Sequence, residues 1–369
     1  MPELLTAAQR RTVERARAFA AEELEPRRHV DPAVARPAVI AAAREVGLYG
    51  MTQPAAFGGS EASAVLLTAL HDELAATNAP HRDAVFGPAP GVLAGVDEPL
   101  RSAYLEPLLA GEKRGAFGFT EPDDAPGPTQ AVVDGDKLVI SGRKSYVTGG
   151  GDADFINVLA HVEDQGPALV VMDTDLPGVV TERRFASLDG SRHAAFRFDA
   201  VRVPRTHLIG APGEGLPKAM GQIGDTRLAL AAQAVGTMRW VLSWLTEHLA
   251  RPDRSGQPRG GKEGVRLRYA DARIHAFAAR SMVYRTARLA DAGDNVINEA
   301  MACKVFATET LGQIVDTAIE LVGGAALVED HPLALLYRQV RSLRVAEGGS
   351  DVLRLNVARG RLELGKGRL

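Results

Sequence analysis

A single carboxylate, Glu347, lies between an apolar segment and a Gly-Gly turn near the end of the chain. Gly348 and Gly349 allow the backbone to approach a ligand closely, and they open a helix-like segment at residues 352–355 whose N–H groups can face an anion. A carboxylate in such a place suits a general base if burial or a flat apolar ligand raises its pKa. Taken alone, the pattern more often marks a simple helix cap and turn.

Two threonines, each near an aromatic residue, form a second candidate site upstream. Thr120 follows Phe119, and Thr148 comes shortly after Tyr146. Two apolar runs around an Asp-Gly turn at residues 131–140 predict a β-hairpin that holds both threonines near one another. Threonine hydroxyls and backbone amides can hydrogen-bond the polar edge of a flat heterocycle while aromatic walls cover its faces. The alternative is an ordinary hairpin with threonines on its exposed face.

The elements that must position these residues follow a helix–sheet–helix order, which indicates an α+β chain. Residues 1–112 form amphipathic helical runs, as at residues 12–24, and predict an N-terminal helical domain. Residues 113–210 change to short strands, including a buried strand at 168–172, and predict a central β domain. Residues 211–369 read as long helices joined by short loops, which predict an antiparallel bundle.

Two features of the C-terminal segment bear on its packing. Cys303 is the only cysteine, so a disulfide framework is excluded, and we expect it to be a buried small apolar side chain in a helix. One apolar stripe at helical spacing consists of Leu267, Ile274, Ala278, Met282 and Leu289.

Composition and charge exclude several classes of function. A hydrophobic fraction of 46% with 24% charged residues is typical of a folded globular protein. The net charge of −3 is scattered, which argues against nucleic acid or an anionic membrane as a partner. The start of the chain lacks the pattern of a signal peptide, and no apolar run reaches membrane-spanning length, so we expect a cytoplasmic protein. The 9 histidines are dispersed without metal-ligand spacing, so no metal site is predicted.

Four motifs in order resemble the acyl-CoA dehydrogenase family, and the resemblance covers nearly the whole chain. Family members carry Thr-Glu-Pro, Gly-x-Lys-x-Trp-Ile-Thr, Phe-Asp-x-Val-x-Val-Pro and Glu-Gly-Thr-Ser. The matching segments here are Phe119-Thr120-Glu121-Pro122, Gly142-Arg143-Lys144-Ser145-Tyr146-Val147-Thr148, Phe198-Asp199-Ala200-Val201-Arg202-Val203-Pro204 and Glu347-Gly348-Gly349-Ser350. The resemblance implies an N-terminal helical domain, a central β domain and a C-terminal four-helix bundle.

The same resemblance implies an activity. The implied activity is FAD-dependent α,β-dehydrogenation of an acyl thioester, in which the acyl group is carried by CoA or by a carrier protein. Glu347 would remove the α-proton while the β-hydride passes to flavin N5, and its backbone N–H would help to hold the thioester oxygen. An electron-transferring flavoprotein or another acceptor would take the electrons. A homotetramer or dimer is implied, and a hetero-oligomer stays open.

The resemblance also implies which residues contact the flavin and the substrate. Thr148 would meet the N5 side of the flavin, and Phe119 with Thr120 the pyrimidine side. Tyr146, where Trp is usual, would cover one face of the ring. Arg227 would supply a charge near the substrate, unless it is only an exposed cation on a helix surface. The remaining cofactor-binding positions are Val147, Gly323, Gly324, Gly348, Gly349 and Arg254.

Departures from the family pattern concern the phosphates. Asp123 and Asp124 follow Thr-Glu-Pro where the family has a serine that bonds the pyrophosphate, an unfavourable exchange unless both carboxylates face water. Pro252 occupies the position of a family arginine that reaches a neighbouring subunit's FAD, and Arg251 or Arg254 would have to substitute. Two other functions therefore stay open: a flavin-dependent oxidase or monooxygenase of the same fold, and a flavin-poor subunit of a hetero-oligomeric dehydrogenase.

Overall fold

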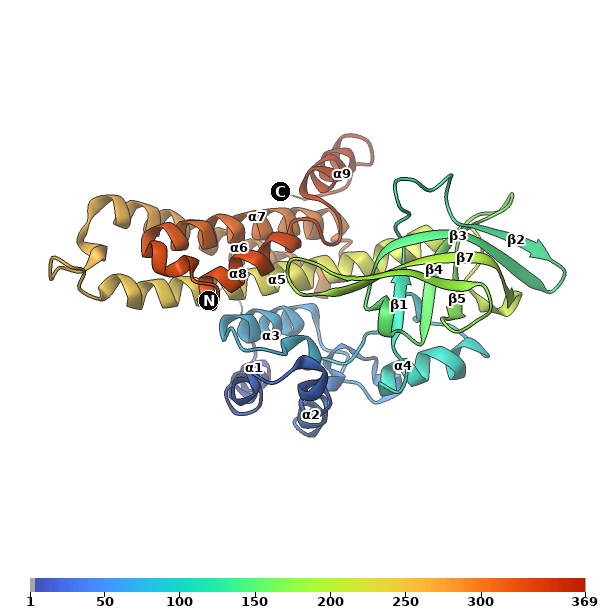
Figure 1. Ribbon diagram of the computed structural model, residues 1–369, viewed down its shortest axis with the longest axis horizontal. Helices are drawn as coiled ribbons and strands as arrows, with labels where there is room; N and C mark the ends of the chain where they lie inside the picture. Colours follow the sequence, from blue (N-terminus) through green and yellow to red (C-terminus); the bar gives the residue numbers. More distant parts are fainter. Residues whose placement is uncertain (1–3, 369) are drawn as a thin grey trace. The chain divides into compact units, whose positions relative to one another are not determined.

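The computed structural model describes residues 4–368, and the chain folds into two compact units. The helical unit contains Met1–Thr52, Ser60–Phe86 and Gly224–Leu369, and the sheet unit contains Gln53–Gly59 and Gly87–Ile223. Helices, then a sheet, then helices follow one another along the chain, which confirms the predicted α+β fold (Figure 1). The division of the chain at residues 112 and 210 stays a prediction.

The N-terminal part of the helical unit is built from three helices: α1 (Ala7–Phe19), α2 (Pro32–Glu45) and α3 (Ala64–Ala76). A capping box starts α1, because the Thr6 hydroxyl accepts from the Gln9 N–H while the Gln9 side chain accepts from the Thr6 N–H. Asp31 caps α2 and Ser63 caps α3 in the ordinary way. Their shared core includes Leu24, Val39, Leu48 and Leu70.

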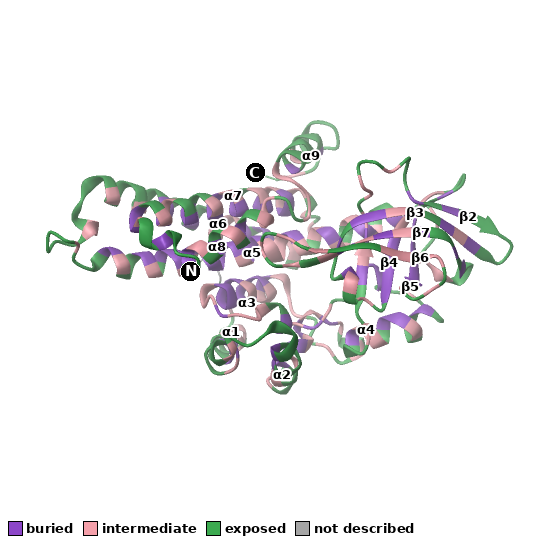
Figure 2. Cartoon of the chain, in the orientation of Figure 1, coloured by how far each residue is buried: buried purple, intermediate pink, exposed green. Residues whose placement is uncertain are grey.

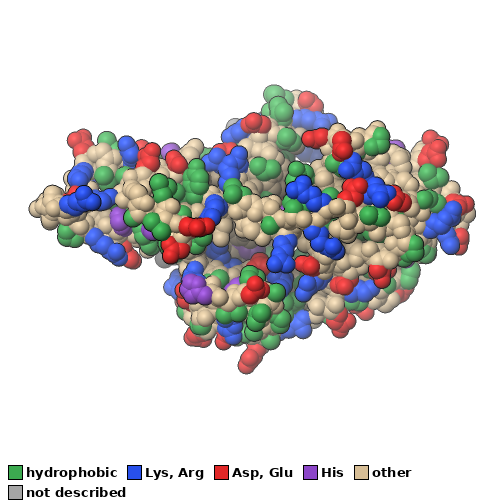
Figure 3. All heavy atoms as spheres, in the orientation of Figure 1, with side chains coloured by type: hydrophobic (Ala, Val, Ile, Leu, Met, Phe, Trp, Pro, Cys, Tyr) green, Lys and Arg blue, Asp and Glu red, His purple; other side chains and the backbone are tan. Residues whose placement is uncertain are grey.

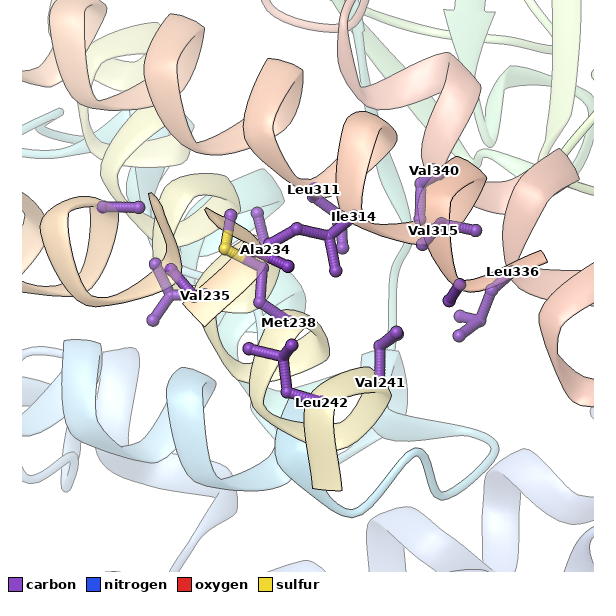
Figure 4. Packing of buried hydrophobic residues seen from close by; sticks show 14 of the residues in the cluster. Ala234, Val235, Met238, Val241, Leu242, Leu311, Ile314, Val315, Leu336 and Val340 are labelled. Carbon is purple, nitrogen blue, oxygen red and sulfur yellow. The ribbon is translucent and has the colours of Figure 1, made fainter. Parts of the chain in front are cut away.

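The C-terminal part of the helical unit is a bundle. Its helices are α5 (Gly215–Ala250, in this unit from Gly224), α6 (Glu263–Asp291), α7 (Ile297–Val322), α8 (Pro332–Leu343) and α9 (Ser350–Leu362). Helices α5 to α8 contribute to one apolar core (Figure 4), which confirms the predicted four-helix bundle. Side chains in that core include Met238, Val241, Leu311, Ile314, Leu336 and Val340. By contrast, α9 is largely exposed, with Leu353 and Gly360 buried (Figure 2).

The apolar stripe marked in the sequence is buried only in part, since Met282 packs against the bundle core while the beginning of the stripe is exposed. Leu267 and Ile274 are 61% and 63% exposed. Instead, α6 buries small side chains such as Ala272, Ala276 and Ala279 against the bundle core. Alanines allow neighbouring helices to approach closely. Further along the helix, α6 also buries Val283 and Tyr284. Cys303, in contrast, is buried in α7 as expected.

The sheet unit contains an 8-stranded sheet in the order β6-β7-β3-β2-β4-β5-β8, with β1 paired to β4. The strands are β1 (Gly115–Gly118), β2 (Gln130–Asp134), β3 (Lys137–Thr148), β4 (Phe155–Val162), β5 (Gly166–Asp173), β6 (Val179–Ala186), β7 (Arg192–Pro204) and β8 (Leu208–Ile209). A short helix, α4 (Glu106–Ala110), precedes them. The hairpin predicted at residues 131–140 is β2 with β3, and the predicted buried strand is β5.

An irregularity in β3 sets the direction of the side chains of the second motif. Strand β3 pairs antiparallel with β7, and the register shifts between Lys144 and Val147. Tyr146 lies in this break with φ of 53°, so it points outward while Val147 is buried. After the break, Thr148 stands opposite His193 on β7.

Charges are mixed over the surface. Figure 3 shows Lys and Arg side chains interspersed with Asp and Glu over the visible face. Between residues 4 and 368, no helix is both long enough and apolar enough to cross a bilayer.

Candidate active site

The carboxylate singled out in the sequence, Glu347, lies in the turn between α8 and α9. Its φ of 55° is a left-handed backbone conformation, which is uncommon for a residue other than glycine. Gly348 follows with φ of 106°, and a Cβ there would come within 3.0 Å of the Leu353 side chain. A glycine is therefore needed after Glu347, and the surrounding contacts must hold the strained turn in place.

Two buried cations hold this turn by its carbonyl oxygens. Arg227 of α5 donates its Nε–H to the carbonyl oxygen of Glu347 at 2.9 Å. Lys304 of α7 donates from Nζ to the carbonyl oxygens of Arg344 at 3.1 Å and Gly348 at 2.8 Å. The two side chains are 7% and 0% exposed, so these charge-assisted bonds offset the cost of burying each cation. The alternative interpretation of Arg227 as an exposed helix cation is wrong.

Burial and neighbouring charges shift the pKa of Glu347 in opposite directions. Desolvation raises the pKa of its carboxyl above the ordinary value, while Arg227 and, more weakly, Lys304 lower that pKa. The same crowding lowers the pKa of Lys304 to about 8, mainly through burial and then through the charge of Arg227. A carboxyl with a raised pKa is a stronger base in its ionised form, which is the direction that proton abstraction requires.

A second set of contacts secures the start of α9. The Ser350 hydroxyl donates to Glu309 Oε1 of α7 at 2.7 Å, and Arg344 pairs with Glu309 Oε2 at 3.3 Å. Gly312 leaves room for the Arg344 guanidinium, since a Cβ at Gly312 would come within 2.1 Å of it. The serine of the Glu-Gly-Gly-Ser motif therefore ties the turn to α7.

Lys304 is a site residue that was not predicted from the sequence. A signal was available, because this lysine lies among the apolar residues of α7, next to Cys303 and one turn from Ala300 and Ala307. A lysine is almost never fully buried unless its ammonium group is paired. That rule predicts that the ammonium group of Lys304 has a partner, but it does not identify the partner. The partners are main-chain carbonyl oxygens about forty residues further along the chain.

In the sheet unit, a buried lysine positions the first threonine. Lys144 is 1% exposed, and its Nζ donates to the carbonyl oxygen of Phe119 at 3.0 Å and to the carboxylate of Glu121. The Ser145 N–H donates to the Thr120 carbonyl oxygen at 2.8 Å. The segment with Thr120 is thereby fixed to β3, the strand that carries Thr148, and the Thr120 side chain remains exposed.

The second threonine lies beside aromatic rings. Tyr146 is 68% exposed and meets Phe185 edge-on, with ring centroids 5.7 Å apart. Thr148 is exposed, and its Oγ1 lies 3.3 Å from Nδ1 of His193. Val147 is 1% exposed and packs in the core of the sheet unit.

Gly323 and Gly324 end α7 in an open backbone segment. Gly323 has φ of 86° and ψ of −158°, a region that is essentially restricted to glycine. A Cβ built on either glycine would meet nothing within 4 Å. Arg259 donates to the carbonyl oxygens of Leu321 at 3.2 Å and Val322 at 3.0 Å, which satisfies the end of the helix.

A basic cavity of about 720 Å³ lies at the same end of α7. Its lining contains more cations than carboxylates. The charged lining residues are Arg254, Arg259, Lys262, Arg268, Asp253 and Glu320. Lys262 pairs with Asp253 at 2.7 Å and Arg268 with Glu320 at 2.9 Å, which leaves the cavity with a positive balance suited to phosphate. The loss of the family arginine at Pro252 is thus accompanied by other cations nearby.

The two acidic residues near the expected phosphate position are exposed. Asp124 pairs with Arg143 at 2.9 Å, and this contact lowers the pKa of Asp124. Asp123 is exposed as well. The condition set from the sequence, that both carboxylates face water, is met.

These features fit the parts of a flavin dinucleotide. In the sheet unit, the Thr120 and Thr148 hydroxyls and the exposed Tyr146 ring suit the edge and face of a flat heterocycle. In the helical unit, the open Gly323 backbone and the basic cavity suit a dinucleotide's phosphates and sugar. Between residues 4 and 368, no cluster of His, Cys, Asp and Glu could hold a metal ion.

Comparisons with known proteins agree with this chemistry. Models of the N-terminal, middle and C-terminal domains of acyl-CoA dehydrogenase match residues 6–112, 116–201 and 213–362. A cyclohexane-1-carbonyl-CoA dehydrogenase of Geobacter metallireducens is 30% identical over 328 residues, which cover 85% of this chain and 86% of that protein. An acryloyl-CoA reductase (NADH) of Anaerotignum propionicum is 28% identical over 366 residues, covering 93% and 92%.

A solved structure is similar over nearly the whole length. The crystal structure of a Mycobacterium smegmatis protein described as an acyl-CoA dehydrogenase has a TM-score of 0.87 at 27% identity, and the match covers 96% of this chain and 98% of that one. The chain therefore belongs to the acyl-CoA dehydrogenase family of oxidoreductases, which act on CH–CH groups.

Proposed function

We propose that the protein is an FAD-dependent enzyme that removes one hydrogen from each of the α and β carbons of an acyl-CoA, with Glu347 as the general base. The observation that carries this proposal is the Glu347 turn. A carboxylate is held in a left-handed backbone conformation, burial raises its pKa, and two buried cations hold the adjacent carbonyl oxygens. Delivery of the acyl group on a carrier protein is the alternative form of the substrate.

Proton abstraction falls to the Glu347 carboxylate. Burial makes the ionised carboxylate a stronger base, because its negative charge is poorly solvated. Transfer of the α-proton to the carboxylate neutralises that charge. The charges of Arg227 and Lys304 oppose this rise in the pKa and favour the ionised form that acts as the base. By resemblance, the backbone N–H of Glu347 donates to the thioester oxygen, where negative charge develops.

Arg227 is proposed to serve the substrate as well as the base. A guanidinium has five N–H donors, and the Nε–H is already used on the Glu347 carbonyl oxygen. Its terminal nitrogens can therefore bond an acyl-group oxygen while Nε fixes the turn. Thr226, the residue before Arg227, has no carboxylate and cannot replace Glu347.

The cofactor would be held by the residues that match the family's flavin contacts. When bound, FAD would supply the acceptor for the β-hydride at N5. Thr148 would orient the N5 side and Tyr146 would cover one face. The other proposed contacts are Phe119, Thr120, Val147, Gly323, Gly324, Gly348, Gly349 and Arg254. The basic cavity that includes Arg254 supports a phosphate contact from this chain.

Partners and location are proposed on the same basis. An electron-transferring flavoprotein or another acceptor would reoxidise the enzyme. Because relatives include a dehydrogenase and an acryloyl-CoA reductase, the redox partner would set the net direction of the reaction. We propose a cytoplasmic homotetramer or dimer, with a hetero-oligomer as the alternative, and three domains at residues 1–112, 113–210 and 211–369.

The visible spectrum of the purified protein tests this function. We expect a flavin band with one FAD per chain, bleached by an acyl-CoA in the absence of oxygen. Rapid oxygen consumption with substrate and no added acceptor would indicate the oxidase or monooxygenase alternative. A colourless protein that takes up no added FAD would contradict the proposal and favour the flavin-poor subunit.

A further inference from the structure

A chain of hydrogen bonds in the sheet unit ends at Thr148. Thr148 Oγ1 lies 3.3 Å from Nδ1 of His193. His193 Nε2 lies 2.9 Å from Oγ of Ser191, and Ser191 Oγ lies 2.6 Å from Oδ1 of Asp189. The Ser191 N–H also donates to Asp189 Oδ1 at 3.0 Å. A carboxylate, a hydroxyl, an imidazole and a second hydroxyl are thus connected in series.

The carboxylate end fixes the direction of these bonds. Because an ionised carboxylate only accepts, the Ser191 hydroxyl must donate to Asp189. The Ser191 oxygen then accepts from Nε2–H of His193. In a neutral imidazole this leaves Nδ1 as an acceptor, so the Thr148 hydroxyl donates to it. Thr148 consequently presents an oxygen lone pair, an acceptor, to a ligand.

Protonation of His193 would reverse the last bond. With hydrogen on both ring nitrogens, Nδ1–H donates to Thr148, and the Thr148 hydroxyl is released to donate to a ligand. His193 therefore allows one hydroxyl to serve as either acceptor or donor.

The surroundings hold the imidazole in place. Its ring stacks on Phe185 of β6 with centroids 5.5 Å apart and an interplanar angle of 21°. The guanidinium of Arg183, also on β6, lies over the Phe185 ring, 4.8 Å from the ring centroid. Tyr146 of β3 also meets Phe185. The charged groups that face His193 are thus Asp189, through Ser191, and Arg183, through Phe185.

We propose that His193 is a positioning residue that sets the hydrogen-bond polarity of Thr148 toward the redox-active nitrogen of the cofactor. This inference rests on the proposed function, in which Thr148 meets flavin N5. A ring nitrogen without hydrogen requires a donor, whereas the reduced N–H requires an acceptor. With a neutral His193, Thr148 is an acceptor, and the site favours the reduced form of the cofactor over the oxidised form.

The midpoint potential of the FAD-loaded protein tests the inference, because it reports the ratio of affinities for reduced and oxidised FAD. The variant is His193→Phe, which retains a ring to stack on Phe185 but has no nitrogens. We expect the ratio to shift toward oxidised FAD by about twofold to tenfold, the effect of one hydrogen bond. His161→Phe, at an exposed position on β4, is the matched control and should cause no shift.

A double-mutant cycle separates action through Thr148 from a structural effect. In a Thr148→Val background, His193→Phe should cause no further shift, because the hydroxyl that it positions is gone. An unchanged ratio in His193→Phe, or shifts of the two substitutions that simply add, would overturn the inference. If His193→Phe does not fold, Ser191→Ala removes the acceptor for Nε2–H and should shift the ratio by a similar factor.

These experiments distinguish a failure of the inference about His193 from a failure of the proposed function. A wild-type protein that binds FAD and is bleached by acyl-CoA, yet shows no effect of His193, retains the function and loses the inference. A protein that binds no FAD loses both.

Discussion

Lys304 contributes to the pKa of the proposed base, since its charge lowers the pKa of Glu347. Lys304→Met removes that charge and keeps the apolar stem, so the pKa of Glu347 should rise further. A base works only when ionised, and a higher pKa means that activity is lost at a higher pH as the solution is acidified. We expect the acid limb of the pH profile for flavin bleaching by acyl-CoA to move to higher pH.

The control for this substitution is Lys218→Met, at a half-buried position of α5 in the sheet unit. It should leave the acid limb unchanged. A limb that stays in place in Lys304→Met, or that moves to lower pH, would show that Lys304 does not act on the base by charge.

At the scale of the element, the turn between α8 and α9 depends on one glycine. Gly348→Ala places a Cβ on a backbone with φ of 106° and within 3.0 Å of Leu353. We expect it to lower the free energy of unfolding by about 1–3 kcal/mol, the cost of strain at such a position, and to reduce the rate of flavin bleaching.

Gly349→Ala is the matched control for that substitution. Gly349 has φ of −60° and ψ of 149°, and a Cβ there would meet nothing within 4 Å. Chemical denaturation should show little change in its unfolding free energy. Equal losses in both variants would refute the assignment of strain to the position of Gly348.

Elements were predictable where a local pattern decides them. The hairpin at residues 131–140 follows from its Asp-Gly turn, and α1 to α3 follow from amphipathic runs. The buried face of α6 was not predictable, because alanines chosen for close packing carry less hydrophobic signal than the exposed Leu267 and Ile274. Glu347 stood out through its Gly-Gly turn, whereas Lys304 and His193 depend on partners that only the folded chain supplies.

At the scale of the whole molecule, one buried carboxylate ties the N-terminal helices to the bundle within the helical unit. Asp72 of α3 is 1% exposed and accepts from Arg239 of α5 at 2.8 Å. It also accepts from Arg280 and the Tyr284 hydroxyl of α6, each at 2.9 Å. Asp72→Ala would leave these donors without their carboxylate, and we expect it to lower the free energy of unfolding by about 3–5 kcal/mol.

An exposed ion pair provides the comparison. Asp83, 78% exposed, pairs with Arg36 at 2.8 Å. Asp83→Ala should cost no more than about 1 kcal/mol in the same denaturation experiment. A cost for Asp72→Ala as small as that for Asp83→Ala would mean that the buried network does not hold the N-terminal helices to the bundle.

The central claim is that Glu347 removes a proton from a thioester beside a bound flavin. It is tested most directly by mixing the FAD-loaded protein with acyl-CoA without oxygen and following the flavin band in the wild type and in Glu347→Gln. We expect the variant to keep its FAD and its spectrum but to be bleached at least about 100-fold more slowly, the contribution of a general base. Bleaching of Glu347→Gln at the wild-type rate would contradict the central claim.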